Sequence, residues 1–160
     1  MEKVKAAGKA RSIGVSNFLQ SHLEAILKSA KVTPSINQIE YHPYIQHGGL
    51  VQFQGDKGIK TASYGPLTPI TRAKDGPLGE VLQTLAYKYG VSEGEILLRW
   101  SIDRGDVSIT TSSKESRLSS YLRALRFRLT PKELDEISAI GRQKHYRAFW
   151  RDKFADDDRQ

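Results

Sequence analysis

Four short apolar segments, which alternate with stretches of helical periodicity, constrain the fold of this chain more than any other feature. Most of these segments are followed by glycine, proline or small polar residues. Such alternation is typical of βαβ units, in which helices cover both faces of a parallel sheet. The predicted strands are residues 10–15, 35–40, 59–64 and 107–110.

Start and stop signals place helices between and after these strands. Thr130 is a predicted N-cap, with Pro131 at the first helical position and Glu133 at the capping-box position. Ser92 is a second predicted cap, and we expect the glutamates after it to be solvated in a first turn that the helix dipole favours. The predicted helices are residues 4–9, 20–31, 48–57, 78–89, 93–102, 114–122 and 131–140.

The length of the chain limits how much of a barrel it can form. A complete eight-stranded (β/α) barrel usually needs about 250 residues and at least about 200, whereas this chain has 160. Four strands without an internal repeat therefore predict an α/β fold that is half of a (β/α)8 barrel. We expect one incomplete domain over residues 1–160, with residues 142–160 as an extended C-terminal tail. Because residues 4–9 resemble only the end of a helix, Met1 would already lie inside that helix, and we therefore expect the sequence to be truncated.

The composition excludes several classes of protein. Hydrophobic residues make up 38% and charged residues 27% of the chain, as in globular proteins. The sequence has no cysteine, which excludes disulfides, thiolate metal sites and a cysteine nucleophile. No apolar run approaches the roughly 20 residues of a membrane span, and the charged N-terminus does not resemble a signal peptide. We expect a cytoplasmic protein with no membrane partner and no metal.

The net charge of +7 and the pI near 9.6 leave the partner open. Nucleic acid, an anionic membrane surface and a phosphorylated ligand would each suit a basic protein. Basic residues gather between Lys114 and Lys132, where Arg117, Arg123 and Arg126 lie on one stretch. This stretch is either a solvated helix or a binding surface for phosphate groups.

Polar and aromatic residues fall at the predicted carboxyl ends of the strands, where barrel enzymes hold their working residues. Ser16, Asn17, Gln38, Tyr64 and Thr111 occupy these positions. The Asn and Gln amides can match the carboxamide of a nicotinamide ring, and the tyrosine offers a flat face for stacking. Alternatively, the same side chains cap a helix, fill a polar gap and pack in the core.

Two runs carry a family resemblance: Gly-Val-Ser-Asn-Phe at residues 14–18 and Asn-Gln-Ile-Glu-Tyr-His-Pro at residues 37–43. Together with residues 64–67 and 96–105, they resemble the aldo-keto reductase family over nearly the whole chain. The resemblance implies the C-terminal half of a TIM barrel in an NADPH-dependent oxidoreductase. Such an enzyme transfers hydride to the carbonyl of a ketone or aldehyde.

The resemblance also implies roles for individual residues at the nicotinamide end. Ser16, Asn17 and Gln38 would hold the carboxamide, and Tyr64 would stack on the nicotinamide ring. The pyrophosphate would be bordered by Pro66, Leu67 and Thr68.

Residues 109–117 resemble the adenosine-phosphate segment of the family, although many members have Pro-Lys where this chain has Thr110 and Thr111. By resemblance, Arg117 would bind a 2′-phosphate through paired charge-assisted hydrogen bonds, which favours NADPH over NADH. Tyr121 would stack on the adenine. The other residues implied in this segment are Thr111, Ser112, Ser113 and Lys114.

The four catalytic residues of the family, a tyrosine, a lysine, an aspartate and a histidine, belong to its first four strands, which this chain does not contain. His42 resembles a structural loop histidine of the family instead. We therefore assign no catalytic residue and expect the chain alone to be inactive. The second alternative is a non-catalytic nucleotide-binding or interaction fragment, which a complementary half barrel or a second copy could complete. We expect no nucleic-acid partner, and a nucleic-acid-binding protein is only the third alternative.

The tail contains two aromatic residues, Phe149 and Trp150, in a run that resembles fungal-type ketoreductases of 2-dehydropantolactone and conjugated polyketones. By resemblance, they would line a substrate pocket for a bulky or cyclic dicarbonyl. The alternative is an aromatic anchor that docks the tail on the underside of the barrel.

Overall fold

Four parallel strands form a single sheet in the order β1-β2-β3-β4 in the computed structural model, which describes residues 1–154. Ser16 of β1 lies opposite Gln38 of β2, Glu40 of β2 opposite Tyr64 of β3, and Tyr64 opposite Ile109 of β4. This arrangement confirms the predicted half barrel of parallel strands. The strands are β1 (Val15–Ser16), β2 (Ile36–Glu40), β3 (Lys60–Tyr64) and β4 (Val107–Ile109).

The first strand is shorter than predicted and begins at Val15 rather than at residue 10. Its neighbour β2 begins only at Ile36, which the register places opposite Gly14, so the residues before Gly14 have no strand beside them. One backbone hydrogen bond beyond the paired strands, from the Ser35 N–H to the Ile13 carbonyl at 2.8 Å, joins the segments that lead into β1 and β2. In the described part of the chain, β1 and β4 each pair on one side only.

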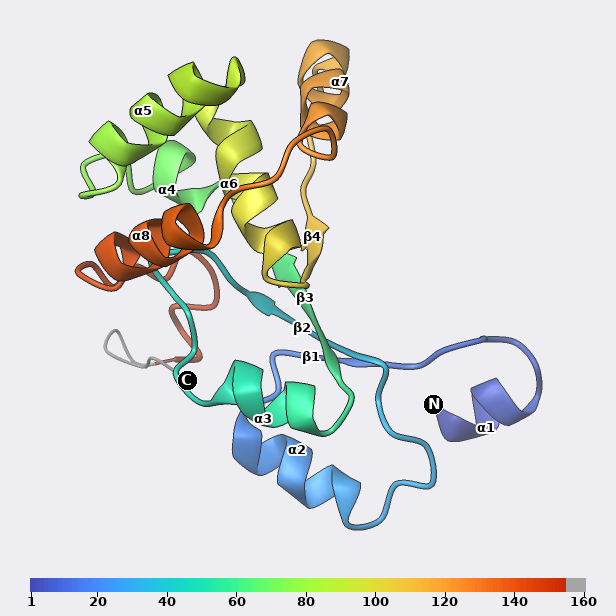
Figure 1. Cartoon of the computed structure of the whole chain (residues 1–160). Helices are drawn as coiled ribbons and strands as arrows, with labels where there is room; N and C mark the ends of the chain where they lie inside the picture. The colour runs from blue at the N-terminus through green and yellow to red at the C-terminus, as the bar shows by residue number, and fades with distance from the viewer. Residues whose placement is uncertain (155–160) are drawn as a thin grey trace.

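Helices connect and cover the strands, and Figure 1 shows α2 and α3 grouped apart from α4, α5, α6 and α8. The short helix α4 was not predicted, because the segment that contains Pro69, Gly76 and Pro77 was interpreted as a loop. Helix α2 ends at Leu27, four residues earlier than predicted, where the Ser29 and Ala30 amides both bond to the Ile26 carbonyl. The helices are α1 (Glu2–Ala6), α2 (Gln20–Leu27), α3 (Leu50–Asp56), α4 (Thr68–Thr71), α5 (Gly79–Tyr89), α6 (Glu93–Asp103), α7 (Glu115–Arg123) and α8 (Pro131–Gly141).

The predicted capping box at Thr130 is present, and Ser92, which was predicted as a simple cap, forms a second one with Glu95. Ser92 and Thr130 each accept a hydrogen bond from the backbone of the glutamate three residues on, and each glutamate bonds back to the cap residue. Glu95 corrects one expectation, however. Its side chain is fully buried and is held by Arg123 of α7, with the Arg123 Nε 3.0 Å from Oε1. The first turn of α6 is therefore a packed junction with α7, not a solvated surface.

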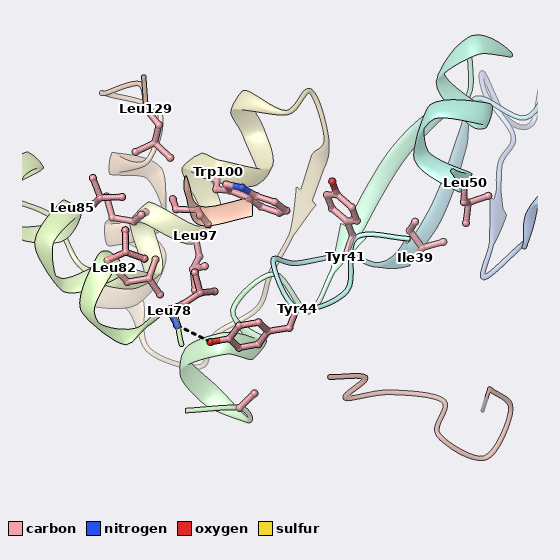
Figure 2. Packing of buried hydrophobic residues seen from close by; sticks show 14 of the residues in the cluster. Ile39, Tyr41, Tyr44, Leu50, Leu78, Leu82, Leu85, Leu97, Trp100 and Leu129 are labelled. Atoms are coloured by element: carbon pink, nitrogen blue, oxygen red, sulfur yellow. Dashed lines mark hydrogen bonds between the residues drawn. The ribbon is translucent and has the colours of Figure 1, made fainter. Parts of the chain in front are cut away.

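The core is centred on Trp100 of α6, which stacks on Tyr41 with ring centroids 5.4 Å apart. Figure 2 shows these two rings facing one another, with leucines of α5 and α6 on the far side of Trp100. The Trp100 Nε1 donates to Ser138 of α8 at 3.0 Å, and the Tyr44 hydroxyl accepts from the Leu78 N–H at 3.2 Å. The core thus joins the loop after β2 to three helices.

The described residues contain no helix that combines the length and the apolar character needed to cross a membrane. In the same part of the chain, no group of three or more histidine, aspartate or glutamate side chains is arranged to hold a metal ion.

Glu133 makes the fold sensitive to acid. Burial would raise the pKa of Glu133, but hydrogen bonds from Lys88, the Thr130 backbone and Tyr89 outweigh burial and lower the pKa from 4.5 to about 2. The folded protein therefore binds the Glu133 proton more weakly than the unfolded chain does. The stabilising contribution is complete above pH 4.5 and is lost as the pH falls from 4.5 towards 2.

Replacing Glu133 by glutamine is expected to lower stability at neutral pH and to remove this part of the acid dependence. The measurement is the urea midpoint of each variant at several pH values through this window. Parallel pH profiles for the Glu133→Gln variant and the unaltered chain would contradict the prediction.

Candidate functional site

A cluster forms from Ser16 and Asn17 at the end of β1, Gln38 in β2 and Tyr64 at the end of β3. Gln38 was expected at the carboxyl end of its strand but lies in the middle of β2, which continues to Glu40. The Ser16 hydroxyl and the Asn17 N–H both donate to the Gln38 carbonyl at 2.9 Å. The Tyr64 hydroxyl donates to Asn17 Oδ1 at 2.8 Å. Asn17 has a φ of 55°, a backbone conformation that asparagine tolerates better than most residues. These contacts link Ser16 and Asn17 to the backbone of Gln38 and link Tyr64 to Asn17, while the role of the four residues in cofactor binding stays a prediction.

Tyr64 is the aromatic member of this cluster and remains a neutral phenol. Burial raises the pKa of Tyr64 to about 12, and the nearby charge of Glu40 adds to the effect. A tyrosine that donates protons near neutral pH needs a pKa closer to the working pH. Tyr64 is thus suited to stacking and hydrogen bonding rather than to acid catalysis.

A cleft of about 830 Å³ lies between α4, α5, the start of α6 and α7. Three of the predicted site residues line it, namely Leu67, Arg117 and Tyr121. Lys74 and Glu93 also line it and were not predicted as site residues. The cleft walls therefore carry two cations and one carboxylate, which favours an anionic ligand.

The residues around Leu67 differ in their exposure. Pro66 and Thr68 are buried, whereas Leu67 is half-buried and borders the cleft. Of the three residues predicted beside the pyrophosphate, Leu67 lines the cleft, whereas Pro66 and Thr68 do not.

Only part of the predicted phosphate-binding segment, residues 111–117, lies at the cleft. Arg117 lies in the cleft wall, whereas Thr111, Ser113 and Lys114 are exposed on the loop before α7 and do not line the cleft. The Ser112 Oγ accepts the Lys114 N–H at 3.0 Å, which shapes the turn that leads into α7. These four residues reach a ligand only where it extends beyond the cleft.

The tail does not dock on the underside of the barrel, so that alternative was wrong. Phe149 meets Tyr64 edge-on, with ring centroids 5.5 Å apart and an interplanar angle of 88°. Because Tyr64 ends β3, this contact lies at the carboxyl ends of the strands. Trp150 follows with half of its surface exposed. The described part of the tail is also folded back over the strands rather than extended, and residues 155–160 of the predicted tail lie outside the described residues.

Two buried residues beside this cluster, Glu40 and His42, were not assigned to the site. The His42 Nε2 lies 3.0 Å from Glu40 Oε1, and both side chains are fully buried. Burial lowers the pKa of His42 although the Glu40 carboxylate raises it. Burial would raise the pKa of Glu40, but hydrogen bonds from His42 and from the backbone of Ala148 and Phe149 lower it overall. Glu40 is therefore an ionised group inside the fold.

A half barrel with polar side chains gathered at the carboxyl ends of its parallel strands has the architecture of (β/α)8 enzymes. The profile of the aldo/keto reductase family matches residues 1–142. The chain belongs to the aldo/keto reductase family, which confirms the predicted resemblance.

Two yeast proteins are among the similar relatives. The NAD/NADP-dependent indole-3-acetaldehyde reductase of Schizosaccharomyces pombe is 41% identical over 151 residues, which cover 93% of this chain and 53% of the relative. The NADPH-dependent alpha-keto amide reductase of Saccharomyces cerevisiae is 40% identical over 157 residues, which cover 94% and 50%. The chain thus spans about half the length of the curated relatives it matches.

Solved structures show the same relation. The aldo-keto reductase of Bombyx mori in complex with NADP superposes with a TM-score of 0.80 at 33% identity, covering 88% of this chain and 48% of that chain. An aldo-keto reductase from a Medee basin deep-sea metagenome superposes with a TM-score of 0.82 at 29% identity, covering 91% and 53%.

Proposed function

We propose that these residues form the NADPH-binding half of an aldo-keto reductase that reduces the carbonyl of a ketone or aldehyde. The observation that carries the proposal is the strand-end cluster, in which the Tyr64 hydroxyl fixes the amide of Asn17 beside Ser16 and Gln38. Amide and hydroxyl groups are the donors and acceptors that a carboxamide requires. A cysteine-free chain suits a reducing compartment, so the proposal places the activity in the cytoplasm.

In this proposal, each part of the cofactor has its own residues. Ser16, Asn17 and Gln38 bind the nicotinamide carboxamide, and Tyr64 stacks against the ring. When bound, NADPH supplies the hydride that reduces the carbonyl. The neutral phenol of Tyr64 binds and orients without exchanging a proton.

The cleft takes the adenosine end of the same cofactor. Arg117 binds the 2′-phosphate and Tyr121 stacks on the adenine. Leu67, together with the neighbouring Pro66 and Thr68, borders the pyrophosphate. Lys74 adds a second cation to the cleft. The loop residues Thr111, Ser112, Ser113 and Lys114 contact the phosphate from outside the cleft. The two cations favour a doubly anionic group over the free ribose hydroxyl of NADH.

Proton transfer to the carbonyl oxygen is assigned to groups outside these residues, because Tyr64 is too weak an acid and His42 is fully buried. The edges of the sheet are where a complementary half barrel would add those groups. Val107 of β4 is 52% exposed and Leu122 of α7 is 68% exposed, so apolar surface is available for such a contact. Phe149 and Trp150 border the carbonyl substrate, for which we propose a dicarbonyl compound.

The proposal is tested by titrating the 160-residue chain with NADPH and NADH and following cofactor fluorescence. We expect binding with a clear preference for NADPH and no carbonyl-dependent oxidation of the bound cofactor. Sustained turnover by the purified chain, freed of host reductases, would show that its own residues complete the catalytic set. Absence of any nucleotide binding would reject the cofactor site.

A nucleotide-binding protein without turnover is the second candidate, because Tyr64 is too weak an acid and His42 is fully buried, so neither supplies the proton that carbonyl reduction needs. Adding a complementary half barrel distinguishes the two candidates. Carbonyl reduction should appear if the chain is half of a reductase, and should not appear if it is a nucleotide-binding protein without turnover. A third candidate, nucleic-acid binding through the basic stretch, predicts affinity that falls steeply with salt for any sequence. Arg123 is already held by the carboxylate of Glu95, which removes one cation from that surface.

A further inference from the structure

The described part of the tail is attached to the sheet through one buried carboxylate. Glu40, the last residue of β2, accepts the Ala148 N–H at 2.7 Å and the Phe149 N–H at 3.1 Å, one on each oxygen. His42 contacts the same carboxylate from the loop after β2. The Glu40 side chain is fully buried. Two consecutive tail amides therefore converge on a single side chain.

A buried carboxylate is strongly destabilising unless hydrogen bonds replace the water it has lost. His42 supplies one such contact, and the two tail amides supply the others. Charge-assisted bonds to backbone N–H groups are shorter and stronger than neutral ones. The tail backbone is thus an integral part of the environment of Glu40, and Glu40 in turn determines where residues 148 and 149 lie.

The position of these amides places the Phe149 ring beside the strand-end cluster. The ring meets Tyr64 edge-on, and a side chain on Gly65 would put its Cβ only 2.9 Å from Phe149 Cε2. On another side, the guanidinium of Arg72 lies 4.5 Å from the centre of the ring. Phe149 therefore packs against Tyr64, Gly65 and Arg72.

Glu40 and Tyr64 are opposite each other in the register of β2 and β3. The carboxylate that holds the tail is thus adjacent to the residue proposed to stack on the nicotinamide. A shift of the tail amides would move Phe149 away from Tyr64 and open that end of the site.

We propose that Glu40 is a positioning residue, whose buried carboxylate holds the tail so that Phe149 forms a wall at the nicotinamide end of the site. This inference rests on the proposed function and adds to it a residue that acts without touching the cofactor. The adenosine end, which lies in the cleft around Arg117, is independent of this wall. Loosening the tail should therefore weaken binding of the nicotinamide part of the ligand alone.

Two variants separate the carboxylate from the wall. Glu40→Gln places an amide donor where one tail N–H needs an acceptor, so the Ala148 and Phe149 amides should lose protection from hydrogen exchange. Phe149→Ala removes the ring but leaves both backbone bonds, so these amides should stay protected. Glu80→Gln, at an exposed position of α5, is the matched control and should change neither property.

Each variant is titrated with NADPH and with adenosine 2′,5′-bisphosphate, a probe that lacks the nicotinamide. Both Glu40→Gln and Phe149→Ala are expected to bind NADPH about fivefold to tenfold more weakly, which corresponds to roughly 1 to 1.4 kcal/mol. Binding of the bisphosphate should be unchanged, because this probe has no nicotinamide to contact Phe149. A general loss of structure would instead weaken the binding of both ligands.

Several results would overturn the inference. These are unchanged or tighter NADPH binding in the Phe149→Ala variant, equal loss of both ligands, and protected tail amides in Glu40→Gln. If Glu40→Gln does not fold, Phe149→Ala still decides whether the wall contributes to NADPH binding. If the unaltered chain binds neither ligand, the proposed function fails and this inference fails with it. If the unaltered chain binds NADPH and both variants bind it with the same affinity, the inference is refuted but the proposed function is not.

Discussion

Replacing Arg117 by alanine is expected to weaken NADPH binding by about 1.5 to 3 kcal/mol, or roughly tenfold to more than a hundredfold. Arg117 lines the cleft and is the residue proposed to bind the 2′-phosphate. Its planar guanidinium can donate two parallel charge-assisted hydrogen bonds to a phosphate, and alanine can donate none. Affinity for NADH, which lacks that phosphate, should change little. The measurement is the ratio of the two affinities at constant salt.

Two further variants make this test specific. Arg117→Lys keeps the charge but loses the paired geometry, so its NADPH affinity should fall between those of the unaltered chain and Arg117→Ala. Arg126→Ala removes an exposed arginine that does not line the cleft and should leave the NADPH to NADH ratio unaltered. An unchanged ratio in Arg117→Ala would refute the phosphate role. Equal effects of the Arg117 and Arg126 variants on polyanion binding would instead support the nucleic-acid candidate.

Replacing Trp100 by alanine is expected to lower the free energy of unfolding by about 3 to 5 kcal/mol. Trp100 is fully buried, stacks on Tyr41 and donates to Ser138. The substitution removes the ring that joins α6 to α8 and to the loop after β2. A loss of this size approaches the total stability of many small domains, so the variant should be largely unfolded. Urea unfolding followed by circular dichroism measures the change.

An exposed aromatic residue provides the control for this experiment. Tyr87 on α5 is 92% exposed, and alanine is the best helix former, so Tyr87→Ala should change the stability by no more than about 0.5 kcal/mol. Equal urea midpoints for Trp100→Ala and the unaltered chain would mean that Trp100 is not the centre of the core.

Local signals in the sequence were sufficient to predict much of the fold. Thr130 with Glu133 and Ser92 with Glu95 form capping boxes within three residues of one another, so no distant segment is needed to predict them. Gly90 ends α5 in the left-handed conformation, with a φ of 64°, and this too depends on neighbouring residues alone. The short helix α4 was missed because its single turn is too brief to show periodicity.

The candidate site was predictable where it follows strand ends. Asn17 directly follows β1 and Tyr64 ends β3, and the carboxyl ends of parallel strands meet at one edge of the sheet. Gln38 lies in the middle of β2 rather than at its end, opposite Ser16 in the register of the strands. Lys74 gave no such signal, because it lies on a connection whose path depends on the packing of α4 and α5. The burial of Glu95 was also unpredictable, since the partner that holds it, Arg123, is supplied by another helix.

The sequence by itself determined the strand and helix alternation, the caps and the membership of the strand-end cluster. These features follow from backbone hydrogen bonds and side-chain periodicity over a few residues. Only the tertiary structure decided that Glu40 holds the amides of residues 148 and 149, that Phe149 lies against Tyr64, and that Arg117 shares a cleft with Lys74. Such contacts join segments far apart in the chain, and their energies depend on which groups are buried together when the helices pack on the sheet.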